Sequence, residues 1–249
     1  DSLPPLHRAA IAGHRAVVDL LLGINEVNAN TADYNQWTAL HYAAQKARNP
    51  VAQLLLERHA QPDARADRGR CPLHVAARNG HEGVARLLLL HRANADARND
   101  DGFSAIHWAA LHGHSSLCKL LLEQGAQYAA VTAKGVSALH LSAHSGRLEC
   151  AAVLLDGHGV AEERRDSATA LVGMRDEEGR TALHEAASLP SATAVRLLLA
   201  ARAEVTVVDR SGETAQAVAI RTGQTQAATL LLETEVAQHH PVAAAAASS

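Results

Sequence analysis

Hydrophobic residues recur along the chain as short clusters at a nearly constant spacing. Each cluster is a run of three Leu or Val residues, and the runs occupy residues 20–22, 54–56, 87–89, 120–122, 153–155, 197–199 and 230–232. Three apolar residues in a row could belong to a strand. Here each run ends a segment of helical length, such as residues 14–22, in which Val17 and Val18 also face the neighbours. The pattern therefore predicts a helix that is packed on more than one side.

A second pattern precedes each cluster and predicts a shorter helix. Variants of Thr-Ala-Leu-His centre on histidines that are 34, 33, 33, 33 and 44 residues apart, namely His7, His41, His74, His107, His140 and His184. The Thr or Ser before this helix can cap its first turn, as at Thr38. In the first copy Pro5 suits the first helical position, and Gly13 suits a left-handed helix end. The predicted helix runs from Leu6 to about Ala12.

The segments between successive helix pairs predict short fingers with a glycine at the tip. Sequences such as Asp100-Asp101-Gly102 favour a hairpin turn that needs a positive φ. Three places depart from the pattern, and we expect a different local geometry there: the first finger with Asn35-Gln36-Trp37, and the turns at Arg48-Asn49-Pro50 and Leu189-Pro190. Pro4 and Cys71 occupy the capping position of two helices and are expected to cap them less well.

A period of 33 residues with Thr-Pro-Leu-His-x-Ala at its start resembles the ankyrin repeat family. The resemblance covers about residues 3–234 and implies an all-α solenoid of stacked helix-turn-helix pairs with short β-hairpin fingers. Seven repeats are expected, at about residues 3–36, 37–69, 70–102, 103–135, 136–179, 180–212 and 213–235. The fifth contains an insertion of 11 residues, which we expect to form a loop within residues 159–175. An Ala/Ser-rich tail, 236–249, is expected to be frayed.

Composition limits the kinds of partner. The chain of 249 residues has 23 Lys and Arg against 26 Asp and Glu, so no nucleic acid partner is predicted. It lacks a run of about 18 apolar residues, so no membrane insertion is expected. Its three cysteines lie in different repeats, which favours a reducing compartment, the cytoplasm or alternatively the nucleus. Because the chain opens almost inside a repeat, we expect it to be part of a longer protein.

The motif histidines invite a metal-site interpretation, which their spacing disfavours. They occur once per repeat, so they should lie one repeat apart, and the resemblance implies that each forms hydrogen bonds to backbone groups across a finger. No Cys/His or Ser/His/Asp arrangement and no glycine-rich phosphate loop stands out from the repeat pattern. We therefore predict no catalytic residue, metal, cofactor or small-molecule substrate, and the chain is not expected to be an enzyme.

The aromatic residues carry the clearest functional signal. The resemblance implies that the residue before the capping Thr or Ser and the residue after the motif histidine face a concave groove. Four of the six aromatic residues fall at these positions: Trp37, Phe103, Tyr42 and Trp108. Interfaces are enriched in Trp, Tyr, Phe and Arg. The predicted partner-binding residues are Trp37, Tyr42, Arg70, Val75, Arg78, Phe103, Trp108, Leu111, Val136 and Leu141; alternatively, the aromatic side chains only pack on one another.

These features predict a protein–protein interaction module, an adaptor or scaffold that binds a helix or an extended peptide in its concave groove. One alternative is a structural subunit that docks in a large assembly through its convex face, insertion or tail. Another is the targeting domain of a larger enzyme, such as a ubiquitin ligase. In the insertion, Arg164-Arg165-Asp166-Ser167 resembles a site for basic-directed kinases, which makes Ser167 a candidate phosphorylation site.

Overall fold

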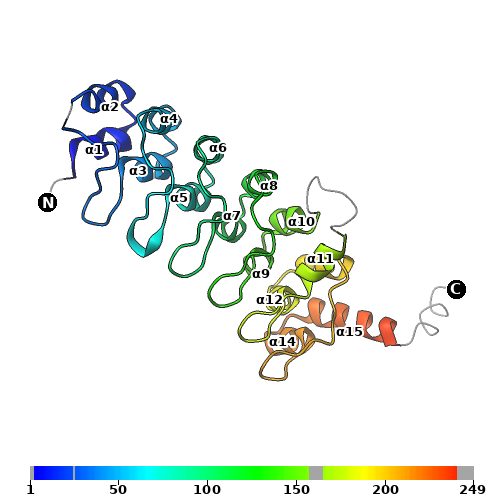
Figure 1. Ribbon diagram of the computed structural model, residues 1–249. Coiled ribbons are helices and arrows are strands. Elements are labelled where there is room, and N and C mark those ends of the chain that lie inside the picture. Colours follow the sequence, from blue (N-terminus) through cyan, green and yellow to red (C-terminus); the bar gives the residue numbers. More distant parts are fainter. Residues whose placement is uncertain (1–2, 25, 157–164, 240–249) are drawn as a thin grey trace. The chain divides into compact units, whose positions relative to one another are not determined.

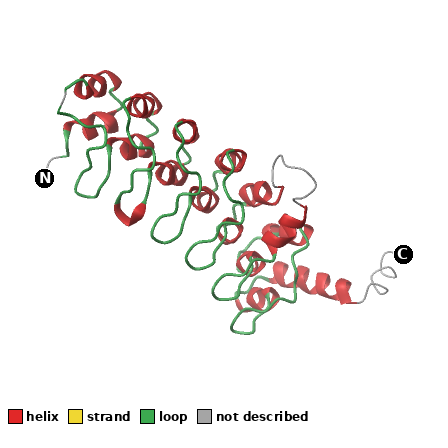
Figure 2. Ribbon diagram, in the orientation of Figure 1, coloured by secondary structure: helices red, strands yellow, loops and turns green. Residues whose placement is uncertain are grey.

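The chain divides into two compact units, and each consists of stacked helix pairs. The computed structural model describes residues 3–24, 26–156 and 165–239, without the side chains of 165–168 and 239. Unit 1 is Asp1–Ala133 and unit 2 is Lys134–Ser249. In both units the described residues are helices joined by turns and long loops (Figure 2).

Unit 1 consists of four helix pairs. The first helices α1, α3, α5 and α7 lie side by side in one row, and the second helices α2, α4, α6 and α8 form another row (Figure 1). The elements are α1 (Pro5–Ala12), α2 (Arg15–Leu22), α3 (Ala39–Gln45), α4 (Asn49–Glu57), the 3-10 helix η1 (Asp67–Gly69), α5 (Pro72–Asn79), α6 (Glu82–Leu90), α7 (Ala105–His112) and α8 (Ser115–Glu123). The expected all-α stack of helix pairs is confirmed.

Unit 2 repeats this arrangement with three pairs and one additional helix. The first helices α9, α12 and α14 pack in sequence, as do the second helices α10, α13 and α15, while α11 packs on α10. The elements are α9 (Ala138–His144), α10 (Leu148–Asp156), α11 (Arg165–Val172), α12 (Ala182–Ala187), α13 (Thr193–Ala200), α14 (Ala215–Arg221) and α15 (Thr225–His239).

The leucine clusters contribute to the core, but the prediction is wrong for the terminal helix α2, where Val17 is 45% exposed and Leu20 is 73% exposed because α2 has a second-helix neighbour on one side only. Second-helix residues such as Leu55, Leu88 and Leu121 are fully buried, and first-helix residues such as Leu40 and Leu73 face them. Most of these helices have only six to nine residues, and helices of that length are not stable alone in water. Burial of a leucine side chain contributes about 1.5–3 kcal/mol, so packing between neighbouring pairs holds each helix.

The motif histidines connect each repeat to the next finger. His41 illustrates the arrangement: its Nδ1 accepts the Thr38 N–H at 3.2 Å and the Thr38 hydroxyl at 2.9 Å. Because Nδ1 is an acceptor, the ring proton lies on Nε2, which donates to the carbonyl oxygen of Arg70 at 3.1 Å. Equivalent bonds to the next finger join His7 to Trp37, His74 to Ala97, His107 to Ala130, His140 to Arg180 and His184 to Glu213.

The first histidine is the exception that the sequence anticipated. Pro4 occupies the capping position before α1 and offers neither an N–H nor a hydroxyl, and the buried Nδ1 of His7 has no hydrogen-bond partner within the described residues. We expect Pro4→Thr to stabilise α1 by about 1 kcal/mol, because threonine supplies both donors. Hydrogen exchange should show about fivefold greater protection of the α1 amides. Pro4→Ala supplies only the N–H, so equal protection in both variants would contradict a role for the hydroxyl.

The first finger does not differ from the others in the way the sequence suggested. Gln36 adopts φ +61° at the position where other fingers have glycine, and its N–H donates to the Asp33 carbonyl oxygen at 3.0 Å. The finger closes as the glycine fingers do because Asp33 Oδ1 accepts the N–H groups of Asn35 and Trp37, both at 2.8 Å. A left-handed Gln costs about 1–2 kcal/mol, which these hydrogen bonds offset. The expected different tip shape is therefore wrong.

The second finger is the one in unit 1 that changes shape. At the position of Asp33 it has Ala66, which cannot accept the two N–H groups, and both Arg68 and Gly69 take positive φ values within η1. Among the described residues the fingers contain no regular strand, and isolated bridges mark the hairpin pairing: Ala32 with Thr38 and Val208 with Thr214, with further bridge residues at Val131 and Ser137.

The two unusual inter-helix turns behave differently from each other. Ala47 adopts φ +54°, in place of the usual glycine, and Arg48 N–H donates to the Ala43 carbonyl oxygen at 2.9 Å as in the glycine turns. The expected non-standard geometry is therefore wrong at this turn, because alanine tolerates the left-handed region at a modest energy cost. At Leu189-Pro190 the expectation is confirmed: proline cannot take a positive φ, α12 ends at Ala187, and α13 begins only at Thr193.

The insertion in the fifth repeat is partly helical rather than a loop. Residues 157–164, including Arg164, lie outside the described residues, whereas residues 165–172 form α11. Leu171 and Val172 are buried, so α11 adds apolar contacts beside α10. The expected loop is thus wrong for the described part, because burial of these apolar side chains offsets the conformational entropy that is lost when the helix forms. Ser167 lies in α11 with its side chain outside the description, and its phosphorylation stays a prediction.

The last helix extends further than the sequence suggested. We expected a frayed tail after Glu235, yet α15 continues to His239. Residues 235–239 contain Val236, Ala237 and Gln238, which are compatible with a helix. The rest of the tail, 240–249, lies outside the described residues.

Candidate functional site

Two positions that are five apart in sequence recur in each repeat, and we call the two residues a facing pair; the two side chains are in contact in the second, fourth and sixth repeats. One member precedes the capping residue and the other follows the motif histidine. The ring centroids of Trp37 and Tyr42 are 5.1 Å apart, and those of Phe103 and Trp108 are 5.0 Å apart. The third repeat has Arg70 and Val75 at these positions. The face of unit 1 therefore alternates between aromatic pairs and an Arg–Val pair.

Carboxylates from the fingers hold the first aromatic pair in place. Tyr42 donates its hydroxyl to Asp33 Oδ2 at 2.6 Å, and Trp37 donates Nε1–H to Asp67 Oδ1 at 2.7 Å. Burial, followed by the hydrogen bond to Asp33, raises the pKa of Tyr42 well above its usual range. Burial alone would raise the pKa of Asp67, but hydrogen bonds from Trp37 and Arg70 outweigh it and lower that pKa. Both aromatic rings are thus fixed before any partner binds.

A hollow of about 390 Å³ separates the two tryptophans of unit 1, and we call it the tryptophan hollow. Arg70 and Arg78 project over it: the Arg70 guanidinium carbon lies 5.7 Å from the Trp37 ring centroid, and that of Arg78 lies 5.7 Å from the Trp108 centroid. These distances are typical of cation–π contacts. The hollow is lined by Trp37, Gln45, Arg70, His74, Val75, Arg78, Asn79 and Trp108.

The other predicted partner-binding residues differ in their position relative to the tryptophan hollow. Val75 is only 5% exposed, so it offers its side chain to the floor of the hollow rather than to an outer surface. Phe103 supports Trp108, which also stacks on His112 with ring planes 8° apart. Leu111 lies on α7, outside the lining of the hollow. Val136 and Leu141 belong to unit 2 and form the facing pair of the fifth repeat. The structure therefore gathers five of the predicted residues around one hollow.

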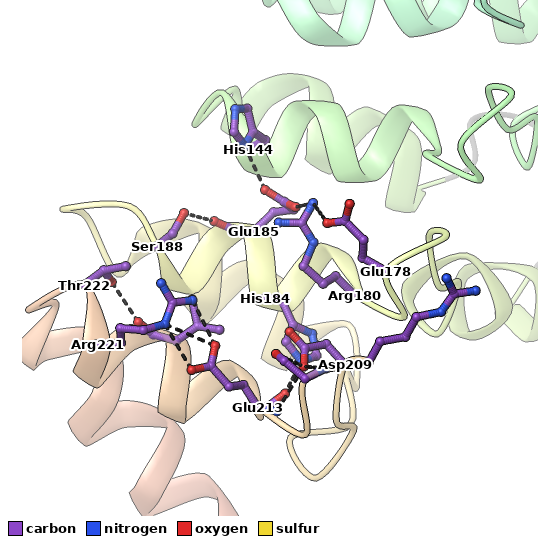
Figure 3. Close-up of a pocket in the computed structure, with 13 residues that line it drawn as sticks. His144, Glu178, Arg180, His184, Glu185, Ser188, Asp209, Glu213, Arg221 and Thr222 are labelled. Atoms are coloured by element: carbon purple, nitrogen blue, oxygen red, sulfur yellow. Dashed lines mark hydrogen bonds and ion pairs between the residues drawn. The ribbon is translucent and has the colours of Figure 1, made fainter.

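Unit 2 has a polar counterpart, a hollow of about 440 Å³ that we call the ionic hollow (Figure 3). Its centre is Glu185, which is 8% exposed. One carboxylate oxygen contacts His144 Nδ1 at 2.7 Å and the other contacts Arg180 Nη2 at 3.1 Å. Arg180 also reaches Glu178 at 3.1 Å. At the far side Arg221 forms a bidentate pair with Glu213. The carboxylates Glu185 and Glu213 thus already have cationic partners.

Sequence reasoning placed these ionic residues at groove positions but did not select them. Arg180 and Glu185 are the facing pair of the sixth repeat and have the same spacing as Trp37 and Tyr42. That spacing was the available signal. In this pair an ionic contact replaces the contact between aromatic rings.

The three cysteines are not in a reactive environment. Cys71, Cys118 and Cys150 are unoxidised and buried. Burial raises the pKa of the Cys71 thiol to about 11, which keeps it a weak nucleophile at neutral pH. Within residues 3–24, 26–156 and 165–239, every helix is too short or too polar to cross a bilayer.

Comparison with known proteins identifies the repeat and its fold. The sequence matches the family model for ankyrin repeats, which describes three copies, over residues 1–66, 61–132, 118–209 and 168–242. The structure is similar to the crystal structure of the human ASB11 ankyrin repeat domain, with a TM-score of 0.79 and 24% identity, covering 92% of this chain and 98% of that one.

A second similar structure is the ankyrin repeat domain of Bcl-3, described as a unique member of the IκB protein family. The TM-score is 0.74 at 26% identity, and the match covers 88% of this chain and 94% of that one. The family model covers most of the sequence, and ankyrin repeats are in general protein–protein interaction modules. The helix pairs, the histidine bonds and these matches together show that the chain belongs to the ankyrin repeat family.

Proposed function

We propose that this protein is an adaptor or scaffold that binds a partner protein through the first-helix face of unit 1, with the tryptophan hollow as its anchor site. The observation that carries this proposal is the hollow itself, of about 390 Å³, between two tryptophans whose neighbours hold them in place. Clefts of this size commonly receive a ligand group. Side chains that served only to pack on one another would fill the space between them, as they do in protein interiors.

Rigid aromatic groups favour binding for a second reason. A partner that contacts them loses little free energy in ordering their side chains, because Trp37 and Tyr42 are already fixed by Asp67 and Asp33. Interface residues of this type dominate affinity in many complexes. The ionic hollow supports this role less directly, since its carboxylates Glu185 and Glu213 already pair with Arg180 and Arg221.

The proposed location is the cytoplasm, because three buried free cysteines suit a reducing compartment. Docking as a fixed subunit through another face, and service as the targeting domain of a larger enzyme such as a ubiquitin ligase, remain the alternatives. The first of these alternatives predicts binding that does not depend on the tryptophan hollow.

Affinity capture from the source cell tests the proposal. The wild type should retain a partner, and Trp108→Ala should reduce the retained amount at least tenfold, because loss of a central tryptophan removes a major contact. Leu90→Ala is the matched control, since Leu90 is 71% exposed on the second helix α6. Far-UV circular dichroism verifies that both variants fold. Equal retention by Trp108→Ala and wild type, together with the same result for Trp37→Ala, would rule out the hollow as the binding site.

A further inference from the structure

The first-helix face of unit 1 has an unbalanced charge. Helices α1, α3, α5 and α7 contain no Asp or Glu, whereas exposed basic residues occur at Arg8, at Lys46 just after α3, and at Arg78. The whole chain is slightly acidic, with a formal charge of −3. The basic character is therefore a local property of this face and does not follow from composition.

The carboxylates nearest the tryptophan hollow do not neutralise Arg78. Asp33 is buried and already accepts bonds from Tyr42 and two backbone N–H groups. Asp67 accepts Trp37 Nε1–H and pairs with Arg70 at 2.5 Å. Each of these carboxylates thus orients a side chain of the face, and neither forms an ion pair with Arg78 within the described residues.

Two arginines line the tryptophan hollow. Arg70 pairs with Asp67, whereas Arg78 has no carboxylate partner within the described residues. Its guanidinium lies over Trp108, and its backbone carbonyl oxygen accepts a bond from His114 Nε2 at 3.2 Å, which anchors its main chain. An arginine that stacks on an aromatic ring keeps its N–H donors available at the guanidinium edge. Those donors match the two oxygens of a carboxylate.

We propose that the partner segment is an acidic peptide, in which an Asp or Glu carboxylate pairs with Arg78 while a neighbouring apolar side chain enters the tryptophan hollow. This inference rests on the proposed function and adds the chemistry of the partner. Of the residues that line the hollow, Trp37, Trp108 and the buried Val75 offer apolar surface to this side chain, and the polar Gln45 and Asn79 lie beside them. The carboxylate lies at the rim. Apolar anchoring supplies affinity, and the pairing with Arg78 selects acidic over neutral or basic segments.

Selection from a random dodecapeptide phage library on the immobilised wild-type protein tests the inference. The selected sequences should share an Asp or Glu at a fixed spacing from a large apolar residue. On Arg78→Glu the preference at that position should change to Lys or Arg. Arg196→Glu makes the same charge change on the second helix α13 and should leave the wild-type preference unchanged.

A double-mutant cycle then tests the pairing itself. The best selected peptide is synthesised with its acidic residue and with the corresponding amide, and both are titrated against wild type and Arg78→Ala by fluorescence anisotropy. Either change should weaken binding about tenfold, and both together should weaken it no more than one alone. Additive losses, an acidic preference that persists on Arg78→Glu, or failure to enrich any acidic motif would each overturn the inference. Protein capture that depends on Trp108 would leave the proposed function standing in all three cases.

Discussion

Lowering the pH from 7 to 4.5 is expected to reduce the free energy of unfolding of unit 1 by about 5 kcal/mol, through His41 and His74 alone. Burial lowers the pKa of each of these histidines from 6.5 to about 4, although their hydrogen bonds to backbone carbonyl oxygens oppose the shift. In the folded protein both rings therefore stay neutral down to about pH 4. In the unfolded chain they become protonated below about pH 6.5.

The direction of the effect follows from proton binding. Between pH 6.5 and 4 the unfolded state binds more protons than the folded state, so stability falls as the pH falls. The contribution is fully present above pH 6.5 and is lost progressively toward pH 4. Burial also lowers the pKa values of His140 and His184, which gives unit 2 a dependence of the same sign. The lowered carboxyl pKa values of Asp67 and Asp209 act in the same direction, and their effect begins only below about pH 5.

Urea unfolding at a series of pH values measures this effect. The slope of stability against pH should approach 2.7 kcal/mol per unit, about 1.36 for each of the two histidines. His74→Gln removes one titrating group, so its slope should fall by about half even though the variant is less stable at every pH. A stability of the wild type that does not change between pH 7 and 4.5 would contradict the burial of neutral imidazoles in these repeats.

Replacing His107 by alanine is expected to destabilise unit 1 by about 3–4 kcal/mol at neutral pH. His107 is fully buried, and its Nδ1 accepts from the Ser104 N–H and hydroxyl at 3.1 and 2.9 Å. Its Nε2–H donates to the Ala130 carbonyl oxygen at 3.0 Å. The substitution leaves a cavity and also leaves buried polar groups of Ser104 and Ala130 without the ring that joined them.

His91 provides the control for this variant. It lies exposed at the end of α6, so His91→Ala should change stability by no more than about 0.5 kcal/mol. Thermal and urea unfolding of the three proteins at pH 7.5 make the comparison. If His107→Ala and His91→Ala lose equal stability, the histidine bonds between repeat and finger contribute little, and leucine packing alone holds the stack.

The sequence predicted the elements that depend on repeated patterns. The helix pairs follow from side chains that occur once per repeat, such as Leu55, and the histidine bonds were implied by the family resemblance. The expected side-chain cap is found at Ser137 and Thr214, whose hydroxyl oxygens accept a backbone N–H at 3.4 and 3.3 Å. The prediction was wrong where a side chain adopts a conformation that its type disfavours. Gln36 and Ala47 both take positive φ, because neighbouring hydrogen bonds in the finger and the turn outweigh a local preference of about 1–2 kcal/mol.

The candidate site could be located from the sequence only in part. The facing positions followed from the family resemblance, but the hollow between Trp37 and Trp108 depends on the distance between repeats and on Arg70 and Arg78. The roles of Asp33 and Asp67 were not predictable. The residues one and two periods after Asp33 are Ala66 and Asn99, and the residue one period after Asp67 is Asp100, which pairs with Arg65 instead. Helix α11 was missed because an insertion occurs once and has no pattern to compare with.

The histidine bonds also give each unit a direction. Every motif histidine is part of one repeat, but the carbonyl oxygen that it binds lies in or just after the following finger, as for His41 with Arg70 and His140 with Arg180. If a pulling force unfolds a unit from its C-terminal end, each step removes the carbonyl acceptor from a histidine whose ring is still buried. Unfolding from the N-terminal end removes the histidine first and leaves its carbonyl acceptor in the folded part, where water can replace the lost hydrogen bond. The two ends of a unit are therefore mechanically unequal, and resistance to unravelling should depend on which end is pulled.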